Sequence, residues 1–237
     1  MKATLLLLSV TCVALADVAD YQGMRSAMVA EVEYYARIGR DTEAAAFSDA
    51  VLDSLNSVPR HEFVRDAEKR FAYENRPLPI GHGQTISQPY IVALMTELVM
   101  PDRDDVVLEV GTGSGYQAAV LADLVAHVYT IEIIEPLASS ASARLARLGY
   151  DNVTTKLGDG YYGWEAHAPF DAIVVTAAAS HVPPPLIQQL KPGGRMVIPV
   201  GGRFLTQQLL LIEKTAQDEI ITRQIAAVRF VPLTGEH

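Results

Sequence analysis

Short apolar runs alternate with stretches of helical periodicity along most of the chain. Apolar runs that end in glycine, alanine or an acidic residue predict strands over 106–111, 127–132, 152–160, 170–178 and 195–201. Helices are predicted after the first run to about residue 126, after the second over 136–148, and from residue 183. Strands that alternate with helices indicate a mostly parallel sheet with helices on both faces.

Two further apolar runs, 207–214 and 220–233, flank the polar segment TAQDE and predict a C-terminal antiparallel hairpin at one edge of the sheet. The chain is therefore expected to be an α/β protein with a doubly wound, mostly parallel, seven-stranded sheet. Helices are predicted before the sheet over 17–40, 47–58 and 89–100. We divide the chain into residues 1–16, a helical extension over 17–57, and one domain over 58–237.

Residues 1–16 have the layout of a secretory signal. Lys2 precedes an apolar run, and Ala14-Leu15-Ala16 matches a cleavage site of small residues. The run is too short to span a bilayer comfortably. A mis-assigned start, with Met24 or Met28 as the true first residue, is the alternative interpretation.

Charge and cysteine content exclude several kinds of chemistry. The formal net charge is −9 and there is no run of lysine or arginine, so nucleic acid is not an expected partner. The single cysteine, Cys12, lies in the leader, which excludes disulfides, thiolate metal sites and a cysteine nucleophile from the rest of the chain. We expect a monomer without bound metal or stable membrane association.

The segment LEVGTGSGYQ (108–117) is a strand, a glycine-rich turn and a helix start. The dinucleotide fingerprint would need a glycine at 116, where this chain has tyrosine, and no lysine is present for a phosphate loop. Glu109 precedes the first glycine, Gly111, by two residues. A carboxylate there would repel a pyrophosphate and attract an ammonium group.

Two more acidic residues follow strands, Glu132 after the second and Asp159 after the third. Carboxyl ends of parallel strands form the usual ligand crevice, where a carboxylate can bind both ribose hydroxyls. Glu109, Glu132 and Asp159 together outline a site for a nucleoside with a positively charged amino acid tail. S-adenosylmethionine (SAM) fits this description and NAD does not. Each acid taken alone could also be an ordinary loop carboxylate.

The segment GHGQTISQPY (81–90) contains no strong base and no strong nucleophile, but it supplies the hydroxyls of Thr85 and Ser87. Pro89 suits the first position of the following helix. Ser87 and Gln88 would then lie near the positive end of that helix, which favours an anion. Capping of the helix by these two side chains is the alternative, and the two roles are compatible.

Several segments together resemble the protein-L-isoaspartate O-methyltransferase family: PLPIGHGQTISQPYIVALMTEL, VLEVGTGSGYQAAVLA, DGYYGW, PFDAIVVTAAA, LKPGGRMVIPVG and VRFVPL. The resemblance covers about Val58 to Thr234 and implies a Rossmann-like methyltransferase fold. It also implies methyl transfer from SAM to the free carboxylate of isoaspartyl residues in damaged proteins, which starts their repair through a succinimide.

The resemblance also implies roles for individual residues. Ser87 is expected to be catalytic. Substrate binding is expected from Gln84, Thr85, Ile86 and Arg229, and cofactor binding from Glu109, Gly111, Thr112, Gly113, Ser114, Glu132, Asp159 and Gly160. Arg229 could instead pair with a loop carboxylate, and for His82 and His181 a loop position is favoured over substrate contact.

Two other functions stay open from the residues alone: a SAM methyltransferase for a different carboxylate acceptor, and a nucleotide-binding module without catalysis. Because SAM is made in the cytoplasm, we expect a cytoplasmic enzyme. Export to the periplasm through residues 1–16 is the alternative.

Overall fold

A seven-stranded sheet in the order β5-β4-β3-β6-β7-β8-β9 organises the molecule. The computed structural model describes residues 3–38, 46–202 and 206–235. β3 to β7 are parallel, and β8 and β9 add antiparallel strands at one edge, so the predicted fold class is confirmed. The strands are β3 (Val106–Val110), β4 (His127–Glu132), β5 (Val153–Leu157), β6 (Phe170–Val175), β7 (Leu190–Val200), β8 (Gln207–Lys214) and β9 (Ile220–Val228).

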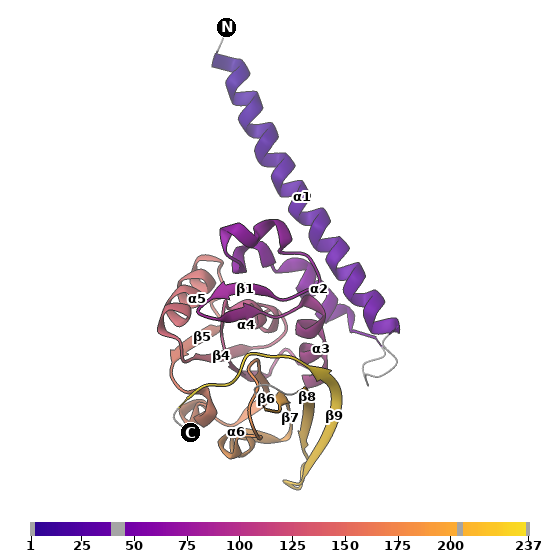
Figure 1. Ribbon diagram of the computed structural model, residues 1–237, viewed down its shortest axis with the longest axis vertical. Helices are drawn as coiled ribbons and strands as arrows, with labels where there is room; N and C mark the ends of the chain where they lie inside the picture. The colour runs from indigo at the N-terminus through magenta and orange to yellow at the C-terminus, as the bar shows by residue number, and fades with distance from the viewer. Residues whose placement is uncertain (1–2, 39–45, 203–205, 236–237) are drawn as a thin grey trace.

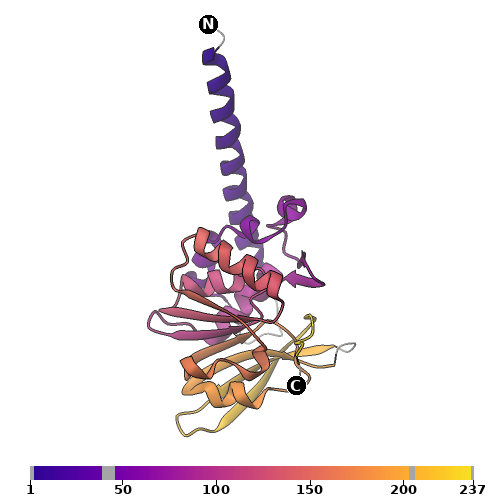
Figure 2. The same ribbon diagram turned by 90° about the vertical axis from the view of Figure 1, so that its left-hand side faces the viewer.

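Helices cover both faces of the sheet (Figure 2). The α-helices are α1 (Ala3–Ile38), α2 (Asp49–Ser57), α3 (Pro89–Val99), α4 (Tyr116–Ala122), α5 (Glu135–Arg147) and α6 (Pro184–Gln189). The 3₁₀ helices are η1 (Arg60–Phe63), η2 (Asp66–Phe71), η3 (Gly160–Tyr162) and η4 (Glu165–His167). Along β3, Val107 packs under α1 to α5, whereas Leu108 and Val110 join the core on the face of α6.

The first helix, α1, extends far beyond the rest of the molecule at its N-terminal end (Figure 1). Its C-terminal half is held by Met28, Val32 and Ala36, which recur at helical spacing and are buried in the main core. The predicted boundary after residue 16 falls inside this helix, and the predicted boundary after residue 57 coincides with the end of α2. Among the described residues, no helix combines the length and apolar character needed to cross a membrane.

Some predicted boundaries were wrong. No strand is predicted before residue 106, but β1 (Leu78–Gly81) and β2 (Gln84–Ile86) form a hairpin around an exposed turn. α4 ends at Ala122 rather than near Ala126. At this end of the helix, the side-chain amide of Asn152 donates to the Ala122 carbonyl at 2.9 Å. The strand predicted over 195–201 begins earlier, because residues 191–194 belong to β7, where they accompany a register shift against β6.

The last predicted strand is also shorter than expected, since β9 ends at Val228. The Gln207 side-chain amide takes over both backbone groups of Phe230, donating to its oxygen at 3.0 Å and accepting from its N–H at 2.6 Å. The chain then crosses to the loop after β6, where Ala178 N donates to Val231 O and Leu233 N donates to Ala178 O. This path brings the C-terminal segment to the carboxyl ends of the parallel strands.

Candidate active site

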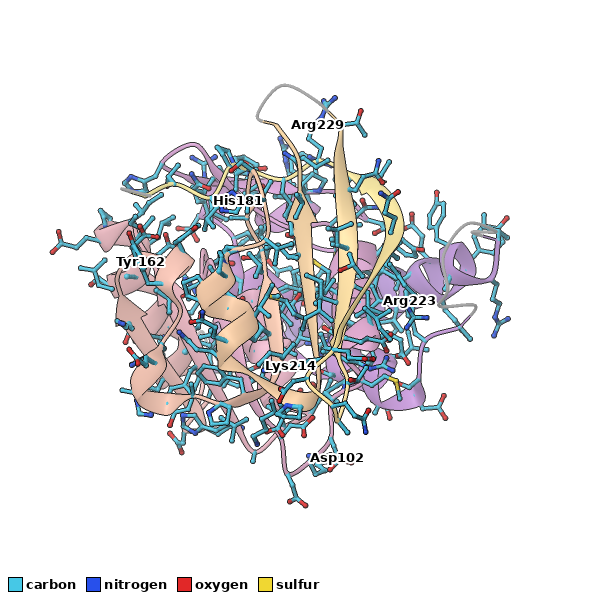
Figure 3. All side chains as sticks on the ribbon, turned by 90° about the horizontal axis from the view of Figure 1, so that it is seen from below. Asp102, Tyr162, His181, Lys214, Arg223 and Arg229 are labelled. Atoms are coloured by element: carbon cyan, nitrogen blue, oxygen red, sulfur yellow. The ribbon has the colours of Figure 1, made fainter. Side chains whose placement is uncertain are left out.

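A cleft that is partly open to solvent lies at the carboxyl ends of β3, β4 and β6. Every predicted site residue except Asp159 and Arg229 lines it. The C-terminal segment and Thr176 complete its wall. Figure 3 shows His181 and Arg229 at this end of the strands, with Lys214 and Asp102 at the opposite end.

The glycine turn brings backbone close to the cleft. Gly111 has φ of +100°, and a Cβ added there would collide with the hydroxyl of Thr176. That hydroxyl donates to the Gly111 carbonyl at 2.6 Å and to the Val110 carbonyl at 3.0 Å. Gly113 and Gly115 also have positive φ values. The turn therefore needs glycine at these positions, because other residues rarely adopt this backbone conformation.

Glu109 is fully buried between β3 and the neighbouring α4. Thr130, its partner in the register of β4, donates a hydrogen bond to Oε2 at 2.5 Å, and Thr112 lies 2.6 Å from Thr130. Oε1 has no hydrogen-bond partner among the described residues. Burial raises the pKa of Glu109 to about 8, so the carboxyl group is largely protonated at neutral pH in the protein alone.

Glu132 connects the end of β4 to the glycine turn. Its Oε2 accepts from Gly113 N at 2.7 Å and its Oε1 accepts from Ile134 N at 2.9 Å. Both oxygens retain a lone pair, and the side chain lines the cleft while being largely buried. A carboxylate held in this way is well oriented to accept hydrogen bonds from two neighbouring hydroxyls.

Asp159 lies at the margin of the site. It begins η3, where its side chain accepts from Tyr161 N at 2.9 Å. The next residue, Gly160, lines the cleft, and a Cβ there would collide with Val110. The structure therefore brings the backbone after β5 to the cleft and leaves the Asp159 side chain beside it.

Residues 84–88, which comprise β2 and the two residues before α3, are called here the acceptor loop. They close the other side of the cleft. Gln88 is the N-cap of α3, but its side chain makes no capping hydrogen bond. Asn75 Oδ1 accepts from Tyr90 N at 3.0 Å instead, so the alternative of capping by the Ser87 and Gln88 side chains is wrong. The hydroxyl of Ser87 has no hydrogen-bond partner among the described residues and is free to bind a ligand.

A second hollow, called here the outer groove, adjoins the cleft. Arg229 and Phe230 form one wall, and the acceptor loop with Pro77 and Ile91 forms the other. Thr85, Ser87, Thr176 and Val231 line both hollows. Arg229 is exposed and has no ion-pair partner among the described residues, so the alternative of pairing with a loop carboxylate finds no support there.

The two histidines considered from sequence line neither hollow. His82 is exposed at the tip of the β1–β2 turn with φ of +51°. His181 lies 3.1 Å from the hydroxyl of Tyr161 and 3.0 Å from that of Ser180. Among the described residues, no group of three His, Cys, Asp or Glu side chains could hold a metal ion.

The sequence analysis singled out neither Thr176, which lines the cleft, nor Arg60, which lies behind Ser87. Thr176 directly follows a buried strand, and a polar residue at that position was an available signal. Arg60 begins η1 and is fully buried behind Ser87. Nothing local in the sequence distinguishes it, because arginine is ordinarily an exposed residue.

The cleft fits SAM. The unpartnered Glu109 oxygen suits an ammonium group, the paired oxygens of Glu132 suit a ribose, and the glycine turn leaves room for close approach. The described residues that line the cleft include no arginine or lysine to bind a pyrophosphate, as a dinucleotide would need.

Comparisons with known proteins agree with this geometry. The family model described as protein-L-isoaspartate(D-aspartate) O-methyltransferase matches residues 39–237. Protein-L-isoaspartate O-methyltransferase 1 of Cupriavidus necator is 70% identical over 192 residues, which are 81% of this chain and 74% of that one. Protein-L-isoaspartate O-methyltransferase 2 of Syntrophobacter fumaroxidans is 60% identical over 238 residues, or 98% and 96% of the two chains.

Solved structures give the same result. A protein-L-isoaspartate O-methyltransferase superimposes with a TM-score of 0.79 at 30% identity, over 89% of this chain and 66% of that one. A putative protein-L-isoaspartate O-methyltransferase from Plasmodium falciparum, in complex with S-adenosyl-L-homocysteine, has a TM-score of 0.72 at 25% identity, over 89% and 98%. The chain belongs to the protein-L-isoaspartate(D-aspartate) O-methyltransferase family.

Proposed function

We propose that this chain methylates the free carboxylate of L-isoaspartyl residues, with SAM as methyl donor, and that Ser87 holds the acceptor. One observation carries the assignment of Ser87. Ser87 lines both the cleft and the outer groove, and its hydroxyl has no partner among the described residues, so one residue can contact an acceptor that enters from the groove and faces the cleft.

The chemistry explains why the acceptor loop lacks a strong base. An isoaspartyl carboxylate has an ordinary pKa of about 4 and is already ionised at neutral pH. SAM supplies a methyl group on a sulfonium whose leaving group departs as a neutral thioether, so no general acid is needed. The protein must hold one carboxylate oxygen in line with the methyl carbon, and positioning of this kind can contribute about 7–11 kcal/mol.

Cofactor and substrate are assigned to different walls. On the cofactor side we place Glu109, Gly111, Thr112, Gly113, Ser114, Glu132 and Gly160, with Asp159 next to the adenine edge. On the substrate side, the hydroxyls of Thr85 and Ser87 orient the carboxylate without neutralising it. Gln84 and Ile86 shape the same loop, and Arg229 contacts the peptide from the outer groove.

A radiolabelled methylation assay tests the function. Pure protein with labelled SAM should methylate an isoaspartyl peptide and leave the aspartyl peptide of the same sequence unlabelled. Methylation of small carboxylates but not of the isoaspartyl peptide would favour a different acceptor. Binding of SAM without any transfer would favour a nucleotide-binding module.

Damaged proteins and peptides are the proposed partners. The net charge of −9 argues against nucleic acid, and we propose a monomer in the cytoplasm, where SAM is made. The signal-like residues 1–16 support the alternative of export. N-terminal sequencing of the natural protein distinguishes the two, because a start after residue 16 would indicate cleavage and a start at Met24 or Met28 would indicate a shorter cytoplasmic chain.

A further inference from the structure

Arg60 is a buried cation directly behind the acceptor loop. Its exposed fraction is 0%, and it is the only lysine or arginine in the buried class among the described residues. Nε donates to the Ala72 carbonyl at 2.8 Å, and Nη2 donates to the Ser87 carbonyl at 2.7 Å. The guanidinium also lies 4.7 Å from the ring centre of Tyr116, a residue that lines the cleft.

No carboxylate of the described residues pairs with this charge. The partners of Arg60 among the described residues are the two carbonyls and the ring of Tyr116, and Nη1 makes no hydrogen bond there. Burial lowers the pKa of Arg60 to about 10, which still leaves it charged at neutral pH. A buried charge without a counterion strongly opposes folding. Its presence at this position therefore suggests a role outside folding.

The peptide unit between Ser87 and Gln88 connects the charge to the outer groove. Its carbonyl accepts from Arg60, and its N–H, which belongs to Gln88, has no partner among the described residues. Both residues line the groove. A cation bound to the carbonyl polarises the peptide unit and makes this N–H a better donor to an anion.

We propose that Arg60 is the electrostatic complement of the acceptor carboxylate: it attracts the substrate anion from behind the loop and holds the Ser87 backbone in place. This inference rests on the proposed function. The loop itself carries no cation, so the carboxylate oxygen stays free of direct ion pairing and keeps its nucleophilicity. The Ser87–Gln88 peptide unit separates Arg60 from the acceptor and transmits its field.

Substitutions that keep or remove the charge test this role. Arg60→Gln removes the charge, and we expect the KM for an isoaspartyl peptide to rise at least about tenfold. Arg60→Lys keeps the charge but loses the planar fork that reaches two carbonyls, so KM should stay within about threefold and kcat should fall at least about fivefold. The Kd for S-adenosylhomocysteine, from calorimetry, should stay within about twofold in both variants.

Arg65→Gln is the matched control. Arg65 is about half exposed and donates from Nε to the Pro79 carbonyl, in the hairpin that precedes the acceptor loop, at 3.2 Å. Arg65→Gln removes one positive charge, as Arg60→Gln does, from a position near the same hairpin. Its kcat and KM should both stay within about twofold of the parent values.

The inference is overturned if folded Arg60→Gln has the parent KM, or if its peptide and cofactor affinities fall together, as a purely structural role predicts. If Arg60→Gln does not fold, the test uses Arg60→Lys only. An unchanged kcat in Arg60→Lys, or a KM raised about tenfold, then contradicts the proposal. Failure of the proposed function looks different, because the parent protein would then not methylate the isoaspartyl peptide at all.

Discussion

Binding of SAM should release a proton from Glu109. The carboxyl group is fully buried, its pKa is raised to about 8 by burial, and Oε1 lacks a hydrogen-bond partner in the part of the chain that the structure describes. An ammonium group bound at Oε1 favours the ionised form, so the pKa of Glu109 should fall well below neutral in the complex. The proton must leave as the ligand binds, and binding must weaken as the pH falls.

The size of the effect follows from the pKa in the protein alone. When a site must lose a proton with a pKa of about 8, its apparent Kd rises nearly tenfold for each pH unit below 7. Between pH 7.0 and pH 5.5 the Kd for SAM should therefore rise about 30-fold. This window lies below the usual pKa of an α-amino group, about 8, so the ligand keeps its charge throughout.

Isothermal titration calorimetry measures both quantities. The Kd is followed across the window, and titrations in buffers of different ionisation enthalpy give the number of protons released, expected to be about one at pH 6.5. Glu109→Gln cannot ionise and serves as the control, with a weaker Kd that no longer depends on pH. A Kd that changes less than twofold in the parent protein, or an unchanged slope in Glu109→Gln, would refute the reasoning.

Three further substitutions have defined outcomes. Ser87→Ala should lower kcat about 100-fold in the methylation assay, since one oriented donor is lost, while SAM affinity stays within about twofold; an unchanged kcat would exclude the catalytic role. Glu132→Ala should weaken SAM binding at least about tenfold in calorimetry because the ribose and the glycine turn both lose their acceptor, and retained affinity would contradict the ribose assignment. Gly111→Ala should lower the free energy of unfolding by about 2 kcal/mol more than Gly193→Ala in urea denaturation. Both positions have positive φ, but only at Gly111 would the new methyl group collide, with Thr176, so equal losses would contradict the steric argument.

Burial decides the protonation state of Glu109, which the local sequence pattern could not predict. The spacing of Glu109 to the glycines predicts that it attracts a cation as a carboxylate, and the structure places it in the lining of the cleft. The structure surrounds it with β4 and α4, and desolvation changes its protonation at neutral pH. The effect depends on neighbours contributed by other elements.

The sequence by itself determined the seven strands of the main sheet, the glycine turn and the identity of the cofactor, because these depend on periodicity and on short local motifs. Glu109, Gly111 and Gly113 belong to one short segment. Because β3, β4 and β5 are neighbouring parallel strands, their carboxyl ends lie at the same edge of the sheet. Only the tertiary structure decided that residues 85–88 and 227–231 share a groove, and that Arg60 lies behind Ser87. These contacts join distant segments, and packing selects them from many that the same local patterns would allow.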